Sequence, residues 1–442
     1  METALLYILG VVILALGLLI SIALHEIGHL IPAKLFGVRV GQYMIGFGKT
    51  LWSTTKGDTE YGIKAIPLGG YISMAGMLPP KKPGDKPRSG GTGFMETMIQ
   101  DARLSDAEKV LPGQEHRTFY NLPIWKRIII MLGGPFMNLV IAVVLYAIVI
   151  CGFGIPQLST TVGSVSECLI PATSSQQKCS STDPKAPAAL AGVRPGDQLV
   201  SIGGRSVTTW AEATKIIQDS AGKQLTLEVK RGGELLSLQV TPALTERYQL
   251  DADGKIKVDS KGDSLTHEVG MLGISSAYEL VPQTLGAVPP AVWSNIAGVT
   301  NIILNLPQRL VQVAQAAFGP KERDPNGPMS VVGVGRIAGE ITSINTIPVV
   351  EKIQSLLGVL ASLNIALLVF NLIPLMPLDG GHVAGALWEG IRRFFAKLFS
   401  RKDPGPVDVA RLLPLTMAVV VILGAMSLLL IYADIVKPVS LF

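Results

Sequence analysis

The sequence predicts an α-helical polytopic membrane protein with about four transmembrane helices, a membrane-associated β-hairpin region and one inserted extracytoplasmic α+β domain. The 442-residue chain is 48% hydrophobic and 16% charged, whereas soluble domains average about 25% charged residues. Apolar windows of about 20 residues, long enough to cross a bilayer, recur along the chain. The second and third windows are separated by a polar stretch with strand and turn patterns, which predicts the inserted domain.

The four predicted spans are Leu5–Ile31, Ile128–Phe153, Leu356–Leu378 and Leu412–Tyr432. We expect that the first span is not a cleaved signal peptide, because Met1-Glu2-Thr3 lacks a positive charge and no small-residue cleavage site follows. Val281–Phe318 is apolar but interrupted by prolines, and its apolar residues follow helical spacing. We expect an amphipathic helix on the membrane surface there rather than a fifth span.

Charge predicts the orientation of these spans. Lys and Arg are frequent from Lys34 to Arg127 and again after the third span, and loops rich in these residues stay cytoplasmic. Both termini and the segment from Ile155 to about Val350 then lie outside. The net charge of +5 gives no indication of nucleic-acid binding. The outside segment contains Cys168 and Cys179, either as two unpaired thiols or, as we favour, as a disulfide that closes a loop.

The predicted organisation follows from these boundaries. It comprises a first transmembrane helix (1–36), a cytoplasmic β-hairpin region with a flexible insertion (37–126), a second transmembrane helix (127–154), an extracytoplasmic domain (155–280), a membrane-surface amphipathic segment (281–350), a third transmembrane helix (351–382), a cytoplasmic loop (383–411), and a fourth transmembrane helix with a tail (412–442).

The first span ends in a metal-binding pattern, His25-Glu26-Ile27-Gly28-His29. Residues four apart share a helix face, so His25 and His29 can place two imidazole nitrogens on one metal ion. Glu26 is placed to take a proton from a metal-bound water, the arrangement of zinc proteases. A chance occurrence is the alternative, but ionisable residues are costly in an apolar segment and are usually functional there.

A third ligand is needed, and Asp379 is the better candidate. The other histidines are His116, His267 and His382, whereas Asp379 follows the third span and two helix-interrupting prolines. An aspartate at membrane depth indicates function. The alternative is an Asp-Gly turn that ends a helix at the water interface.

The two motifs together carry a family resemblance. His25-Glu26-x-x-His29, with Asn371-x-x-Pro374-x-x-x-x-Asp379-Gly380 downstream, resembles the site-2 protease family of intramembrane zinc metalloproteases. The resemblance implies that His25, His29 and Asp379 bind Zn²⁺ and that Glu26 is the catalytic base. Asn371 is a candidate to hydrogen-bond an unwound substrate.

Three further residues are candidates for binding substrate. Pro67-Leu68-Gly69-Gly70-Tyr71 is similar to a family signature in a β-element near the active site, where an exposed strand edge would hold substrate extended. An ordinary cytoplasmic hairpin is the alternative. Gly134-Pro135-x-x-Asn138 is also similar to a family pattern, so Asn138 either faces the catalytic cavity or only bonds another helix. Pro79–Gly93 reads as a disordered part of an insertion, 77–118, to which we assign no chemistry.

The domain at 155–280 resembles PDZ domains through Ala188-x-x-Ala191-Gly192-x-x-x-Gly196-Asp197-x-Leu199. PDZ domains bind chain termini by strand addition, and Gly270–Ile274 is the candidate carboxylate-binding loop. A vestigial domain that only blocks access is the alternative. A single PDZ-like domain looks most like actinobacterial family members.

The resemblance implies regulated intramembrane proteolysis in the cell membrane, with the active site toward the cytoplasmic side. The expected substrates are single-span membrane proteins, such as anti-sigma factors, already trimmed by an outside protease. Two other functions remain open. A zinc transporter would not need Glu26 beside a ligand, and a catalytically silent PDZ scaffold would bind no metal.

Overall fold

The computed structural model describes residues 2–79, 94–111, 113–174, 176, 179–180, 183–249, 251, 256–259 and 263–439. The chain forms two compact units, which we treat separately. Unit 1 comprises Met1–Phe153 and Gln283–Phe442, and unit 2 comprises Gly154–Pro282.

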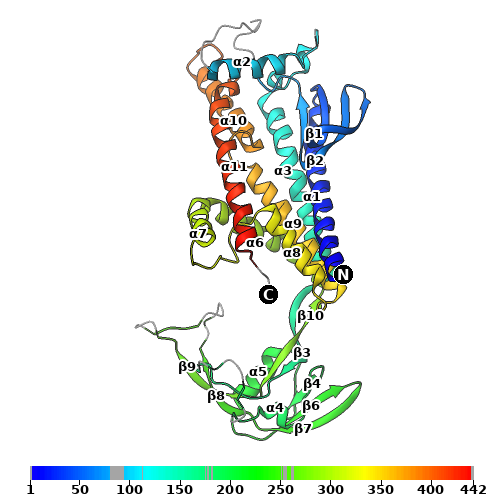
Figure 1. Ribbon diagram of the computed structural model, residues 1–442, viewed down its shortest axis with the longest axis vertical. Helices are drawn as coiled ribbons and strands as arrows, with labels where there is room; N and C mark the ends of the chain where they lie inside the picture. Colours follow the sequence, from blue (N-terminus) through cyan, green and yellow to red (C-terminus); the bar gives the residue numbers. More distant parts are fainter. Residues whose placement is uncertain are drawn as a thin grey trace. The chain divides into compact units, whose positions relative to one another are not determined.

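Unit 1 is mainly helical (Figure 1). Its α-helices are α1 (Glu2–Leu35), α2 (Phe94–Ala107), α3 (Ile124–Ala147), α6 (Val288–Leu304), α7 (Leu306–Phe318), α8 (Val331–Ser343), α9 (Val349–Asn371), α10 (Asp379–Leu398) and α11 (Leu413–Val436). A π-helical turn, Ile148–Phe153, extends α3.

Among the described residues, five helices are long and apolar enough to cross a membrane. This is one more than the sequence predicted, and the additional helix is Leu285–Leu304, within the segment expected on the membrane surface. Its length and composition suit a span, and its expected place on the membrane surface stays a prediction. Pro289 and Pro290 lie in the first turn of α6, and Pro307 lies in the first turn of α7. The first turn has no N–H bonds to lose, so prolines there start helices rather than break them.

Helices α1, α3 and α9 lie side by side and form the centre of unit 1 (Figure 1). Helices α1 and α3 cross where Gly28 meets Gly133, so closely that a Cβ added to either glycine would overlap the carbonyl of the other. Small residues let membrane helices approach in this way. The crossing lies directly beside the histidines of α1.

Two long antiparallel strands, β1 (Val40–Lys56) and β2 (Thr59–Met74), follow α1 where the sequence predicted hairpins. Both strands bend, so that Tyr43 of β1 pairs with Ile72 and also with Tyr61. The Tyr43 hydroxyl donates to the Ala23 carbonyl at 2.9 Å, which anchors the strands to α1. Of the predicted disordered stretch Pro79–Gly93, residues 80–93 lie outside the described residues.

The third predicted span ends earlier than expected. Helix α9 stops at Asn371, seven residues before the predicted end at Leu378, and α10 begins at Asp379. The expected loop of 383–411 therefore begins as helix. Pro374 and Pro377 explain the break, because proline removes a helical hydrogen bond and restricts the residue before it.

Unit 2 is an α+β domain. Its helices are α4 (Pro187–Leu190) and α5 (Trp210–Gln218), and its strands are β3 (Ile155–Val165), β4 (Gln198–Ile202), β5 (Arg205–Ser206), β6 (Leu225–Arg231), β7 (Glu234–Val240), β8 (Ala243–Tyr248), β9 (Thr266–Met271) and β10 (Ile274–Val281). The main sheet has the order β10-β3-β4-β6-β7, with β5 beside β4, and β8 pairs with β9. The disulfide between Cys168 and Cys179 is confirmed.

Candidate metal centre

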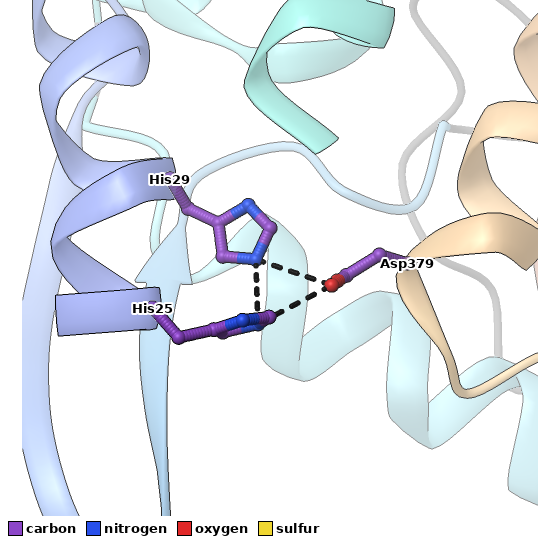
Figure 2. A group of neighbouring side chains, drawn as sticks. All are labelled: His25, His29 and Asp379. Carbon is purple, nitrogen blue, oxygen red and sulfur yellow. Dashed lines mark hydrogen bonds and ion pairs between the residues drawn. The ribbon is translucent and has the colours of Figure 1, made fainter. Parts of the chain in front are cut away.

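The structure brings His25, His29 and Asp379 together (Figure 2). The histidines project from α1, and Asp379 is the first residue of α10. The two Nε2 atoms are 3.2 Å apart, and each lies 3.3 Å from Asp379 Oδ2. Within the described ranges this is the one group of three such side chains whose ligand atoms converge to within 4.8 Å.

The backbone of α3 orients one of these imidazoles. His29 Nδ1 donates to the Ile130 carbonyl at 2.7 Å, because a carbonyl oxygen can only accept. In the neutral ring this bond leaves the lone pair on Nε2, the atom that faces His25 and Asp379. Such a bond to the other ring nitrogen is typical of metal-bound histidine.

The distances and the chemistry of the three groups fit a metal ion. Atoms that bind a tetrahedral zinc at about 2.0–2.1 Å lie about 3.3–3.4 Å from one another. The observed separations of 3.2 and 3.3 Å match this value. A carboxylate oxygen and imidazole lone pairs repel one another at such distances unless a cation lies among them.

Gly134 of α3 provides the space for that ion. A Cβ built on Gly134 would lie 2.6 Å from His25 Nε2 and closer still to His29 Nε2. Real Cβ atoms essentially never approach other atoms this closely. The missing side chain therefore leaves a cradle between the two imidazoles and α3.

All the predicted site residues line one cavity of about 440 Å³. They are His25, Glu26, His29, Gly69, Gly70, Asn138, Asn371 and Asp379. Strand β2 passes directly over Glu26, since a Cβ added to Gly70 would be 3.0 Å from Glu26 Cγ. The metal-binding group, the carboxylate beside it and a strand thus share one cavity.

Asn138 occupies an unusual position in the wall of this cavity. Its side chain is 0% exposed, and neither amide atom has a hydrogen-bond partner among the described residues. Buried amides are nearly always bonded, so an unbonded one in a cavity wall requires an explanation.

The sequence did not identify several residues that support the site. These are Ile130 and the buried ion pair Arg127–Glu389. Gly134 was named only within the Gly-Pro-x-x-Asn pattern, and His382 only among the other histidines. In the ion pair, Arg127 Nη1 donates to Glu389 Oε2 at 3.0 Å and Nη2 donates to Oε1 at 2.5 Å, which joins α3 to α10. Adjacent glycines at 133 and 134 in an apolar helix were the available signal, but they do not specify what the helix approaches.

Comparison with known proteins identifies the family. The sequence model of peptidase family M50 matches residues 13–402 of this chain. The chain belongs to peptidase family M50. This confirms the resemblance to site-2 proteases that the paired motifs indicated.

Full-length M50 relatives are similar along nearly the whole chain. Zinc metalloprotease Rip1 of Mycobacterium tuberculosis is 33% identical over 445 residues, which cover 99% of each chain. Rip1 of Mycolicibacterium smegmatis is 31% identical over 98% of this chain and 99% of its own. Metalloprotease MmpA of Caulobacter vibrioides is 27% identical over 88% of each chain.

Proposed function

We propose that this M50 peptidase is an intramembrane protease that hydrolyses a peptide bond in or near the transmembrane segment of single-span membrane proteins. The family and the relatives named zinc metalloproteases make the chain a zinc metalloprotease. The observation that carries the proposal is the convergence of His25, His29 and Asp379 in a cavity that Glu26 also lines, within a unit built from apolar helices.

His25, His29 and Asp379 would hold the zinc, which supplies a Lewis acid and lowers the pKa of a bound water. Glu26 is the residue after His25 on α1, so its carboxylate lies to one side of the helix face that carries the two histidines. We assign Glu26 as the base that takes a proton from the attacking water and then passes it to the leaving amine.

A helical substrate must unwind before its peptide bonds are accessible, because each carbonyl is bonded within the helix. Gly69 and Gly70 lie in the part of β2 that lines the cavity, so an extended peptide there would lie beside Glu26. Asn371, at the end of α9, and Asn138, with its unbonded amide, would hydrogen-bond the unwound backbone. These contacts are part of the proposal.

We assign unit 2 to the extracytoplasmic side as a PDZ-like gate that acts after a first outside cleavage, with anti-sigma factors as a candidate substrate class. The unit contains a cavity of about 550 Å³, lined by Ile217 of α5 and by Met271–Ile274. Strand β10 is at an edge of the main sheet, so its outer side can accept another strand. These features favour peptide binding over a purely blocking role.

Comparing two variants tests the proposed function. Purified wild type should contain zinc and cut a single-span protein that has been truncated on its outside. Glu26→Gln should keep zinc and bind this substrate yet cut it about 10²–10⁴-fold more slowly, because it cannot accept the proton. His29→Ala should lose zinc.

Two outcomes would favour the other functions. A zinc-free wild type would support the scaffold. Cleavage by Glu26→Gln at the wild-type rate would remove the assigned base, and zinc transport unaffected by this substitution would then support a transporter.

A further inference from the structure

We propose that His382 is a further catalytic residue, which donates a hydrogen bond to the carbonyl oxygen of the scissile peptide as that oxygen gains negative charge. The inference rests on the proposed function, and it concerns a histidine that the motifs leave without a role. Three observations support it: the position of His382 in the cavity, its lack of a partner, and the rigidity of the helix that carries it.

His382 lies in the wall of the same cavity as Glu26 and the three metal-binding residues. It follows Asp379 by three residues on α10, so both side chains share one helix face. Its nitrogens are not part of the group that converges to within 4.8 Å, which excludes it from the ligand set. His382 is therefore beside the metal centre and available for another role.

The imidazole of His382 is half-buried, and no hydrogen bond or ion pair joins it to another described residue. Two other donors near the metal centre are already engaged, whereas the Asn138 amide comes from α3 and is fully buried. The Tyr71 hydroxyl donates to Gln42 Oε1 at 3.2 Å, and His29 Nδ1 donates to the Ile130 carbonyl. An ionisable side chain without a partner, next to a catalytic cavity in a membrane protein, indicates function.

The helix from which His382 reaches the metal centre assigns this residue its role. Glu26 comes from α1 and His382 comes from α10, and both line the cavity that contains Asp379. The base and the imidazole thus reach the metal centre from different helices. A peptide between these helices has the attacking water on the Glu26 side and receives the imidazole from the other.

Contacts of Glu389 fix α10 in place, and with it the backbone that carries His382. Glu389 lies two turns further along α10, has a side chain only 1% exposed, and accepts hydrogen bonds from the Arg127 guanidinium of α3. Arg393 and the Val407 N–H also contact the Glu389 carboxylate, at 3.0 and 3.1 Å. A donor on a fixed helix needs no reorganisation when charge develops, which is the condition for effective oxyanion stabilisation. A neutral imidazole N–H is sufficient for this, so His382 need not be protonated.

The experiment compares His382→Ala with His382→Gln, whose amide keeps an N–H donor. The exposed His116, outside the cavity, provides the matched control His116→Ala. Removing one oxyanion donor typically lowers kcat by about 10²–10³-fold, and we expect this loss in His382→Ala with KM nearly unchanged. His382→Gln should recover at least about a tenth of the wild-type kcat. His116→Ala should behave as wild type.

Three measurements that do not depend on turnover exclude a ligand or folding role. Zinc content and thermal stability in detergent should match wild type in His382→Gln. In the Glu26→Gln background, adding His382→Ala should leave capture of the uncut single-span substrate unchanged, because the proposed bond strengthens only as charge develops.

Loss of zinc from His382→Gln, loss of substrate capture, an unchanged kcat in His382→Ala, or equal damage from both substitutions would each overturn the role of His382. The proposed function fails on different results, namely a wild type that cuts no single-span substrate or a Glu26→Gln variant that cuts at full rate.

Discussion

Gly134→Ala should abolish zinc binding although every ligand remains in place. The added Cβ would lie 2.6 Å from His25 Nε2 and closer to His29 Nε2, whereas ordinary contact begins at 3.4 Å. Helix α3 or the two imidazoles would have to move by nearly 1 Å. A metal site tolerates errors of only about 0.2 Å in ligand distance, so a shift of this size is too large. The shift separates the Ile130 carbonyl from the His29 imidazole that it orients, and the added methyl group fills the space for the ion.

The expected loss follows from that geometry. Changing a residue that only orients a ligand typically costs about 10–100-fold in metal affinity, and filling the site itself should cost at least the upper value. With free zinc buffered about tenfold above the wild-type Kd, wild-type occupancy is about 0.9, and a 100-fold weaker variant is about 0.1 occupied. Zinc per protein is measured in detergent after equilibration with the metal buffer.

Gly358→Ala on α9 is the matched control, since nothing lies within 4 Å of the added Cβ. It should keep full zinc and should not lower thermal stability, because alanine is the better helix former. Zinc occupancy of Gly134→Ala equal to wild type would show that no ion sits between the imidazoles and α3, and the inferred position of the metal would be wrong.

Three more predictions follow from the remaining features. Asn138→Leu should leave the stability in detergent equal or higher, because it removes an unbonded buried amide, yet it should lower cleavage; impaired folding with normal specific activity would contradict this. Arg231 donates to the buried Asp197 carboxylate and holds its pKa below the usual range, so this pair stabilises unit 2 above about pH 4 and the benefit is lost as pH falls through the lowered pKa. Hydrogen exchange of β4 and β6 in the full chain should show Asp197→Asn costing about 1–3 kcal/mol at pH 7 and less at pH 3; an equal cost at both would refute the pair as the cause. A membrane-impermeant thiol reagent should label Cys168 and Cys179 on whole cells after reduction, and labelling only after lysis would reverse the proposed orientation.

Local spacing explains why two of the three proposed metal ligands were predictable. His25 and His29 share a face of α1 because residues four apart always do so in a helix. Asp379 is distant in sequence, and only a polar residue at membrane depth and the family resemblance indicated it. The Ile130 carbonyl that orients His29 is invisible to any motif, since every residue of α3 has a carbonyl and only the helix crossing selects one.

Helix boundaries show the same limit. Proline fixes φ and removes an N–H donor wherever it occurs, but it breaks a helix only in the interior and not in the first turn, where the prolines of α6 lie. The apolar run before Asp379 likewise extends beyond the end of α9 at Asn371, so hydropathy alone extended the third span too far. Hydropathy identifies chain segments that prefer lipid, but it does not show at which residue a helix ends.

The metal centre depends on α3 although α3 supplies no metal-binding side chain. Its contributions are the Ile130 carbonyl, the bare backbone of Gly134, the close crossing at Gly133 and the ion pair of Arg127 with α10. The first three act on α1 and the last acts on α10, so α3 sets both the distance from α1 and the position of α10, the two helices that carry the proposed ligands. A chain with an intact His-Glu-x-x-His and a distant aspartate would therefore still lack a site if α3 were displaced by the nearly 1 Å that one added methyl group requires.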